Sequence, residues 1–181
     1  GLPSQQDVKQ DRAVFNTSYV FIPKRVLTDI VTSYLPHWHQ TRLWVLARPL
    51  SGFAETFSHY IMDVAPGGGS DRPDDDKYAE HIIFVTKGEG SILIANQHYH
   101  LSKGAYLYLP PETSWVLKND SNLSLAFHWF RKRYQRVDGI DLPQVLITSD
   151  SAVESIPMPD TNGAWSTSRF VNPEDLRHDM H

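Results

Sequence analysis

The sequence contains no cysteine among its 181 residues, which excludes disulfides, thiolate metal sites, iron–sulfur clusters and cysteine nucleophiles. It also lacks any apolar run near the roughly 20 residues that span a bilayer. Neither sign of charge is in large excess, because 17 Lys and Arg stand against 21 Asp and Glu, a net charge of −4. We therefore expect neither a nucleic-acid nor a membrane partner. Residues 1–6 lack the basic and apolar regions of a secretory signal, so we expect a cytoplasmic location.

Hydrophobic residues make up 40% of the chain, which is enough for a core, and they occur in short runs. These runs are rich in branched and aromatic residues, and turns containing Gly or Asn separate them. That pattern is typical of an antiparallel β-sandwich or barrel. The predicted strands cover residues 19–23, 44–49, 57–64, 81–86, 91–95, 98–101, 105–109, 115–117 and 123–130. Residues 66–77, rich in Pro, Gly and Asp, are predicted to form a loop.

The composition divides the chain into four parts. Residues 1–18 are polar and are predicted to form an arm, and residues 19–137 contain the strands of one barrel. Residues 138–168 are rich in Pro, Ser and Asp and are predicted to form a linker or wrapped extension. Residues 169–181 follow that linker.

The spacing after residue 103 resembles the second motif of the cupin barrels, G-x5-P-x-G-x2-H-x3-N. Gly104, Pro110 and Asn119 stand in register with this motif, whereas Glu112 replaces its second glycine and Trp115 replaces its histidine. The resemblance implies an all-β fold, the double-stranded β-helix or jelly-roll barrel of the cupins. We also expect Gly104 to adopt a positive φ in a turn, so that a Gly104→Val substitution would impair folding.

The first cupin motif, G-x5-H-x-H-x3/4-E-x6-G, is degenerate here. Counting back from Gly88 places His81 at the glutamate position. The two histidine positions then fall at Asp75 and Lys77, or one residue earlier with the longer spacer. In cupins the histidines and the glutamate hold a divalent ion, but a charged Lys cannot ligate and Trp115 offers no lone pair. We therefore predict no catalytic residue, cofactor or metal ion in this barrel.

Three runs carry a finer resemblance: Phe84 to Gly88, Gly104 to Pro111, and Phe130 to Tyr134. Together with the opening around residues 19–23, they resemble the N-terminal cupin of the (S)-ureidoglycine aminohydrolases, bicupins long described as glyoxylate-induced proteins. The similarity covers roughly residues 11–181. Under this resemblance, residues 169–181 would be the first strand of a truncated second cupin, and the native chain would continue beyond His181.

The resemblance implies a homo-oligomeric, metal-dependent enzyme of allantoin and ureide catabolism. Members hydrolyse (S)-ureidoglycine, a small ureide, to (S)-ureidoglycolate and ammonia. The resemblance places a manganese ion in the second cupin, whose ligands would follow His181, so this half would be structural and inactive alone. Two alternatives stay open. One is a non-catalytic cupin that binds a small carboxylate or sugar. The other is a different metal-dependent cupin enzyme, such as a dioxygenase or isomerase, that uses His59, His81 or His128.

Two H-x-H pairs could ligate a metal, because residues i and i+2 of a strand share a face. His98 and His100 are predicted instead to decorate the solvent face of a hairpin, and His37 and His39 to lie in a loop. Two charged segments are interpreted in the same way. The acidic residues of 71–76 are predicted to be a solvated loop, and the basic run 131–136 to be split by strand alternation and to form interface salt bridges. The aromatic residues predicted to fill a core or an oligomer surface are Tyr106, Tyr108, Trp115, Phe127 and Trp129.

Overall fold

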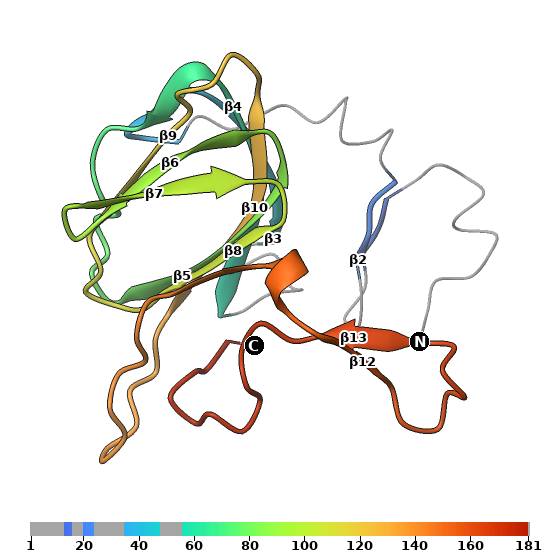
Figure 1. Ribbon diagram of the computed structural model, residues 1–181. Coiled ribbons are helices and arrows are strands. Elements are labelled where there is room, and N and C mark those ends of the chain that lie inside the picture. The colour runs from blue at the N-terminus through green and yellow to red at the C-terminus, as the bar shows by residue number, and fades with distance from the viewer. Residues whose placement is uncertain (1–12, 16–19, 24–34, 48–55, 181) are drawn as a thin grey trace.

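A computed structural model of the chain describes residues 13–15, 20–23, 35–47 and 56–180. The described residues form strands and one 3₁₀ turn, so the all-β prediction is confirmed (Figure 1). Most of the predicted arm and His181 lie outside these ranges. No helix among the described residues is long and apolar enough to cross a membrane. The elements are β1 (Val14–Phe15), β2 (Val20–Phe21), β3 (Trp38–Ala47), β4 (Phe57–Ser70), β5 (Ala79–Lys87), β6 (Glu89–Ile94), β7 (Gln97–Ser102), β8 (Ala105–Leu109), β9 (Trp115–Lys118), β10 (Leu125–Arg133), β11 (Leu146–Ser149), η2 (Asp150–Ala152), β12 (Ser155–Pro157) and β13 (Ser166–Ser168).

The largest sheet has nine strands in the order β11-β8-β5-β10-β4-β9-β6-β7, and β3 also pairs with β4. All of its pairings are antiparallel. The sheet curls around a common interior, so that β6 and β7 lie across from β5 and β8 (Figure 1). The predicted barrel is therefore present.

The strands at the centre of the sheet are buried on both faces. On β10, Phe127 and Trp129 point into the barrel, while His128 and Phe130 alternate with them and point outward. Because side chains of a strand alternate between faces, the same strands supply two apolar cores. The inner core lies inside the barrel, and the outer core lies between the sheet and residues 170–180.

Strand β4 is longer than the sequence pattern indicates, since it continues from Phe57 to Ser70. The loop predicted over residues 66–77 is therefore wrong for residues 66–70, and the loop begins at Asp71. The glycines permit this extension because β9 lies against them. A Cβ on Gly69, whose φ is +138°, would lie 2.1 Å from the carbonyl oxygen of Leu117, so only glycine fits here.

The segment after residue 137 also differs from the prediction. The expected linker contains β11, which pairs with β8 and extends the barrel sheet, and the hairpin of β12 and β13. The strand expected over residues 169–181 is wrong for 169–180, where the chain forms turns. The physical reason is that Phe170 and Val171 pack on the outer core of the sheet. Gly104 has the expected positive φ, 89°.

Candidate functional site

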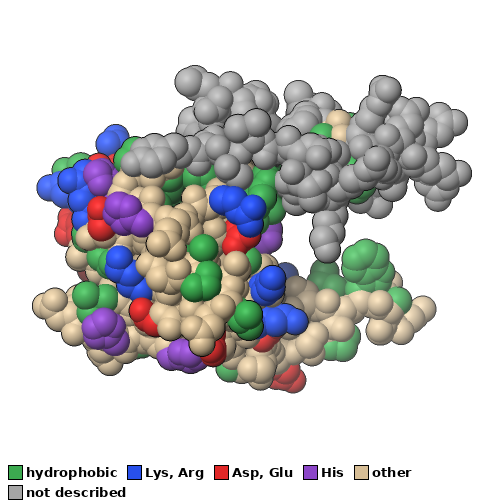
Figure 2. All heavy atoms as spheres, turned by 90° about the horizontal axis from the view of Figure 1, so that it is seen from above, with side chains coloured by type: hydrophobic (Ala, Val, Ile, Leu, Met, Phe, Trp, Pro, Cys, Tyr) green, Lys and Arg blue, Asp and Glu red, His purple; other side chains and the backbone are tan. Residues whose placement is uncertain are grey.

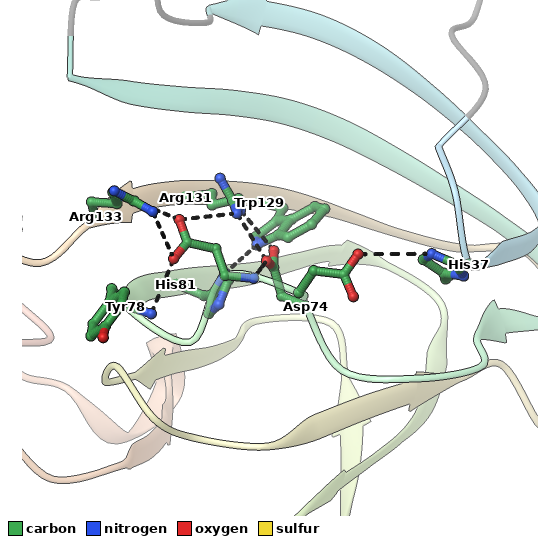
Figure 3. Close-up of polar contacts among 9 residues, drawn as sticks. His37, Asp74, Tyr78, His81, Trp129, Arg131 and Arg133 are labelled. Atoms are coloured by element: carbon green, nitrogen blue, oxygen red, sulfur yellow. Dashed lines mark hydrogen bonds and ion pairs between the residues drawn. The ribbon is translucent and has the colours of Figure 1, made fainter.

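The candidate site lies at one end of the barrel, where the loop of residues 71–78 meets β5, β9 and β10. His81 on β5 is directly opposite Arg131 on β10 in the strand register. Trp129 lies two residues before Arg131 and therefore shares its face. These three side chains consequently converge on the barrel interior (Figure 3).

Tryptophan rings fill the interior beside His81. The ring centroids of Trp38, Trp115 and Trp129 are 5.8–6.3 Å apart, and the His81 ring lies 5.3 Å from that of Trp115. The indole nitrogen of Trp129 donates a hydrogen bond of 3.2 Å to Nδ1 of His81. Burial lowers the pKa of His81 to about 4, so the imidazole is neutral at pH 7 and accepts this bond.

A set of ion pairs forms the rim of the site. Nε and Nη2 of Arg131 donate to the two carboxylate oxygens of Asp74 at 2.7 and 2.8 Å, and Arg133 donates to Asp76 at 2.7 Å (Figure 3). Burial alone would raise the pKa of Asp74, but the hydrogen bonds from Arg131 and from the backbone of Asp76 outweigh it and lower the pKa. The predicted solvated loop is thus wrong for Asp74 and Asp76, which neutralise a basic strand.

The alternation predicted for the basic run is confirmed. Arg131 and Arg133 face the acidic loop, while Lys132 between them points to the opposite face and pairs with Asp179. These salt bridges lie between elements of the described chain. Figure 2 shows basic, acidic and histidine side chains interspersed over another face of the molecule.

The degenerate cupin positions do not fit a metal ion. His81 and Trp115 come together, but the rings contact each other and the other tryptophans. Lys77 is exposed, and its amine lies 5.1 Å from the ring centroid of Tyr78. Asp75 is exposed and pairs with Arg72. No group of three or more His, Asp or Glu among the described residues is arranged to hold a metal.

The remaining motif positions have structural roles. The buried Asn119 side chain donates to the carbonyl oxygens of Val64 and Leu123, both at 2.8 Å, and accepts from Ser121. The backbone of Gly104 bonds to Val85 on one side and to Asp150 on the other. Pro110 is buried at the end of β8. These residues hold turns together and do not reach the site.

The other histidines do not join this site. His59 and His128 lie on the outer face, where their ring nitrogens are 2.8 Å apart and His59 stacks on Phe130. The structure therefore separates them from His81, so a metal-dependent enzyme that uses His59, His81 or His128 could not combine His81 with the other two. Burial and the proximity of His128 lower the pKa of His59 to about 4. His98 and His100 are exposed, as predicted.

The prediction of a loop for the first H-x-H pair is only partly right. His37 lies in a turn, but His39 belongs to β3 and bonds to Asp71 at 2.9 Å. The solvated-loop prediction also fails to anticipate this contact with Asp71. Near His37, the site contains a cavity of about 310 Å³. The side chains that line it include Trp38, Tyr60, Ser70, Arg72, Asp74 and Arg131.

Sequence reasoning missed two features of the site. The first is Trp38, which no strand prediction included, although it lies between the two histidines of the H-x-H pair after Pro36. The second is the pairing of Asp74 with Arg131. The acidic and basic runs were both visible, and their opposite charges were the only signal that they would meet. A separation of 57 residues hides such a contact until the strand register is known.

Comparison with known proteins supports the fold. Residues 60–131 match the cupin domain family. The chain is similar to a protein from Pseudomonas aeruginosa described as a glyoxylate-induced protein, with 47% identity and a TM-score of 0.86 over 99% of this chain and 65% of that one. It is also similar to YlbA from E. coli, with 20% identity and a TM-score of 0.73 over 85% of this chain and 62% of that one.

A third likeness, to a protein from Thermotoga maritima described as a predicted oxalate decarboxylase, has 14% identity and a TM-score of 0.53 over 59% of this chain and 96% of that one. No significant match was found among curated proteins. The chain spans only 65% and 62% of the lengths of the Pseudomonas and E. coli proteins. These findings confirm the predicted cupin fold.

Proposed function

From the cupin fold of this chain, we propose that it is the N-terminal, metal-free half of a two-barrel (S)-ureidoglycine aminohydrolase. The similarity to a glyoxylate-induced protein over nearly the whole chain supports this assignment. The observation that carries it is the composition of the barrel interior. His81 and Trp115 occupy two positions where other cupins have metal ligands, and both rings pack against tryptophans.

In this proposal the complete protein replaces the amine of (S)-ureidoglycine by a hydroxyl group from water. The C–N bond breaks, a C–O bond forms, and ammonia and (S)-ureidoglycolate leave. A manganese ion would be held by residues outside this chain, since the residues present do not fit one. The barrel described here would supply packing and oligomer contacts.

The test is an ammonia-release assay with (S)-ureidoglycine, combined with metal analysis of the protein that contains both barrels. We expect ammonia release with manganese and one ion per chain. The count should stay at one in a His81→Gln variant, because His81 holds no metal. Absence of ammonia release with manganese bound would contradict the enzyme assignment. Loss of a metal ion in His81→Gln would contradict the metal-free barrel.

A second candidate is a barrel that binds a small carboxylate or sugar, and the cavity of about 310 Å³ favours it. Tryptophan and tyrosine side chains could stack on a sugar ring, and Arg72 could bind a carboxylate. Calorimetric titration with such compounds would test this candidate. Arg72→Ala should abolish the heat of binding. Arg42→Ala, which removes an exposed cation that pairs with Asp63 and does not line the cavity, should leave it unchanged.

A further inference from the structure

Residues 169–180, which we call the strap, lie across the outer face of β5, β8 and β10. Phe170 stacks on Tyr106 with ring centroids 4.2 Å apart and an interplanar angle of 3°. The ring of His178 packs edge-on against Tyr108 at 4.5 Å. The strap therefore covers tyrosines of β8 that would otherwise face solvent. In Figure 1 it is the red end of the chain, beside the C label.

Two carboxyl groups, one from the sheet and one from the strap, meet where the strap packs on the sheet. Glu80 on β5 is fully buried, and its Oε2 accepts a hydrogen bond of 2.6 Å from the hydroxyl of Tyr108. Asp179 on the strap accepts at Oδ2 from Lys132 at 2.7 Å and from the backbone nitrogen of Gln135 at 3.0 Å. The other oxygen of each carboxyl group is buried, and no protein N–H or O–H donates to it.

These two remaining oxygens satisfy each other only if one carboxyl group carries a proton. Burial and, next in size, the neighbouring Asp179 together raise the pKa of Glu80 to about 8. Burial acts in the same direction on Asp179, but hydrogen bonds from Glu80 and Lys132 outweigh it and lower its pKa. At neutral pH the proton therefore lies on Glu80, which donates to the Asp179 carboxylate.

We propose that this shared proton is a latch for the strap, which stays seated while Glu80 is protonated and leaves the sheet when Glu80 ionises. Loss of the proton would place two negative charges together in a buried site, and such charges are costly without full compensation. The titratable groups that face the pair from the elements packed against it are Tyr106 and Tyr108 of β8, Lys132 of β10, Tyr134 after it, and Asp175 and His178 of the strap.

Lys132 is the one Lys or Arg among the described residues that contacts the pair, and its charge already balances Asp179. A second carboxylate would therefore have no cation of its own among the described residues. Opening the strap would uncover an apolar cavity of about 750 Å³. Its lining includes Ile82, Phe84, Tyr106 and Phe130 from the sheet and Phe170 and Met180 from the strap. The latch thus controls access to an apolar face, and it does not depend on the proposed aminohydrolase activity.

The absence of cysteine makes a labelling experiment direct. Val171, a strap residue that is only 7% exposed because it packs against the sheet, is replaced by cysteine in the complete protein and treated with a thiol reagent. An exposed Ser151→Cys variant serves as the control, because the ratio of the two rates cancels the ionisation of the thiol itself. We expect this ratio to rise about tenfold between about pH 6.5 and about pH 9.5, with a midpoint near 8 set by Glu80.

Two further substitutions test the origin of the rise. In Glu80→Gln the amide keeps a donor for Asp179 but cannot ionise, so the ratio should stay low at all pH values. Tyr108→Phe removes a hydrogen bond that stabilises ionised Glu80, so the midpoint should move to higher pH. A pH-independent ratio in the parent, or the same rise in Glu80→Gln, would overturn the proposal. If Glu80→Gln does not fold, an unshifted midpoint in Tyr108→Phe would overturn it.

Discussion

The two faces of β5 bury neighbouring ionisable residues that become neutral by opposite routes. His81 points into the barrel and is neutral because burial removes its proton, whereas Glu80 points outward and is neutral because burial retains one. Their pKa values move to about 4 and about 8. A strand buried on both faces must neutralise both groups, so the inner face is sensitive to acid and the outer face to alkali.

The two faces also differ in what seals them. The inner face is closed by tryptophans carried on β3, β9 and β10, all strands of the barrel sheet. The outer face is closed by a strap without regular structure, which joins the sheet through the rings of Phe170 and His178 and through the contacts of Asp179 with Glu80 and Lys132. We therefore expect the inner core to determine global stability and the outer core to open locally.

The largest expected effect comes from a pair of adjacent substitutions on β10. Trp129→Ala removes a buried ring from the inner core and leaves His81 without its donor, which should cost about 3–5 kcal/mol of unfolding free energy. Phe130→Ala removes a half-buried ring from the outer face and should cost roughly half as much. Urea denaturation followed by circular dichroism measures both values. Equal losses would contradict the difference between the two cores.

The next effect concerns the pH dependence of the outer face. The pKa of Glu80 rises from 4.5 to about 8 in the folded state, so the folded state binds more protons than the unfolded one between these values. The stability contribution of Glu80 is therefore complete below about pH 4.5 and is lost as the pH rises through about 8. Glu80→Gln should remove this decline.

At about pH 8.5 the Glu80→Gln variant should be more stable than the parent by about 2–4 kcal/mol, since one pKa unit corresponds to roughly 1.4 kcal/mol. Denaturation midpoints between about pH 5 and about pH 9 test this expectation. Asp138→Asn, a change at an exposed acidic residue in the segment after β10, is the matched control. Its stability should depend on pH as that of the parent does.

On the inner face, the free energy of unfolding should change with pH in the opposite direction and by a smaller amount. The pKa of His81 falls from 6.5 to about 4 on folding, so the unfolded state binds more protons in this window. Stability is therefore complete above about pH 6.5 and declines as the pH falls towards 4, by about 2–3 kcal/mol in total. His81→Gln keeps an acceptor for Trp129 and should remove this loss of stability at acid pH. An unchanged loss would show that His81 does not cause it.

Much of this contrast could be predicted from the sequence, but not all of it. Short branched and aromatic runs identified the barrel strands, and alternation correctly assigned Arg131 and Lys132 to opposite faces. The motif spacing also placed His81 and Trp115 at two cupin ligand positions, and the structure brings their rings together. These features are local, because periodicity and spacing depend only on neighbouring residues.

The outer face could not be predicted because its contacts join distant parts of the chain. The sequence predicts a strand over residues 169–180, yet packing on β8 and the pair of Glu80 with Asp179 determine their structure. The sequence predicts a loop at the glycines of β4 for a similar reason, since the close approach of the distant strand β9 is what requires glycine at position 69. Propensity alone does not contain these tertiary contacts.

The smallest expected effect separates the two ion pairs at the rim of the inner face. Asp74→Asn breaks a bidentate, largely buried pair with Arg131 and should cost about 1–2 kcal/mol at neutral pH, between exposed and fully buried pairs. Arg133→Ala removes the exposed partner of Asp76 and should cost less.

The pH and salt dependence of the two pairs should also differ. Because Arg131 lowers the pKa of Asp74, the contribution of this pair to stability is complete above the ordinary carboxyl pKa and is lost as the pH falls below it. Added salt screens exposed pairs most, so about 1 M NaCl should remove the Arg133→Ala loss and leave most of the Asp74→Asn loss. Equal salt sensitivity would mean that the rim is solvated throughout, and the loss of stability at acid pH would then come from His81 alone.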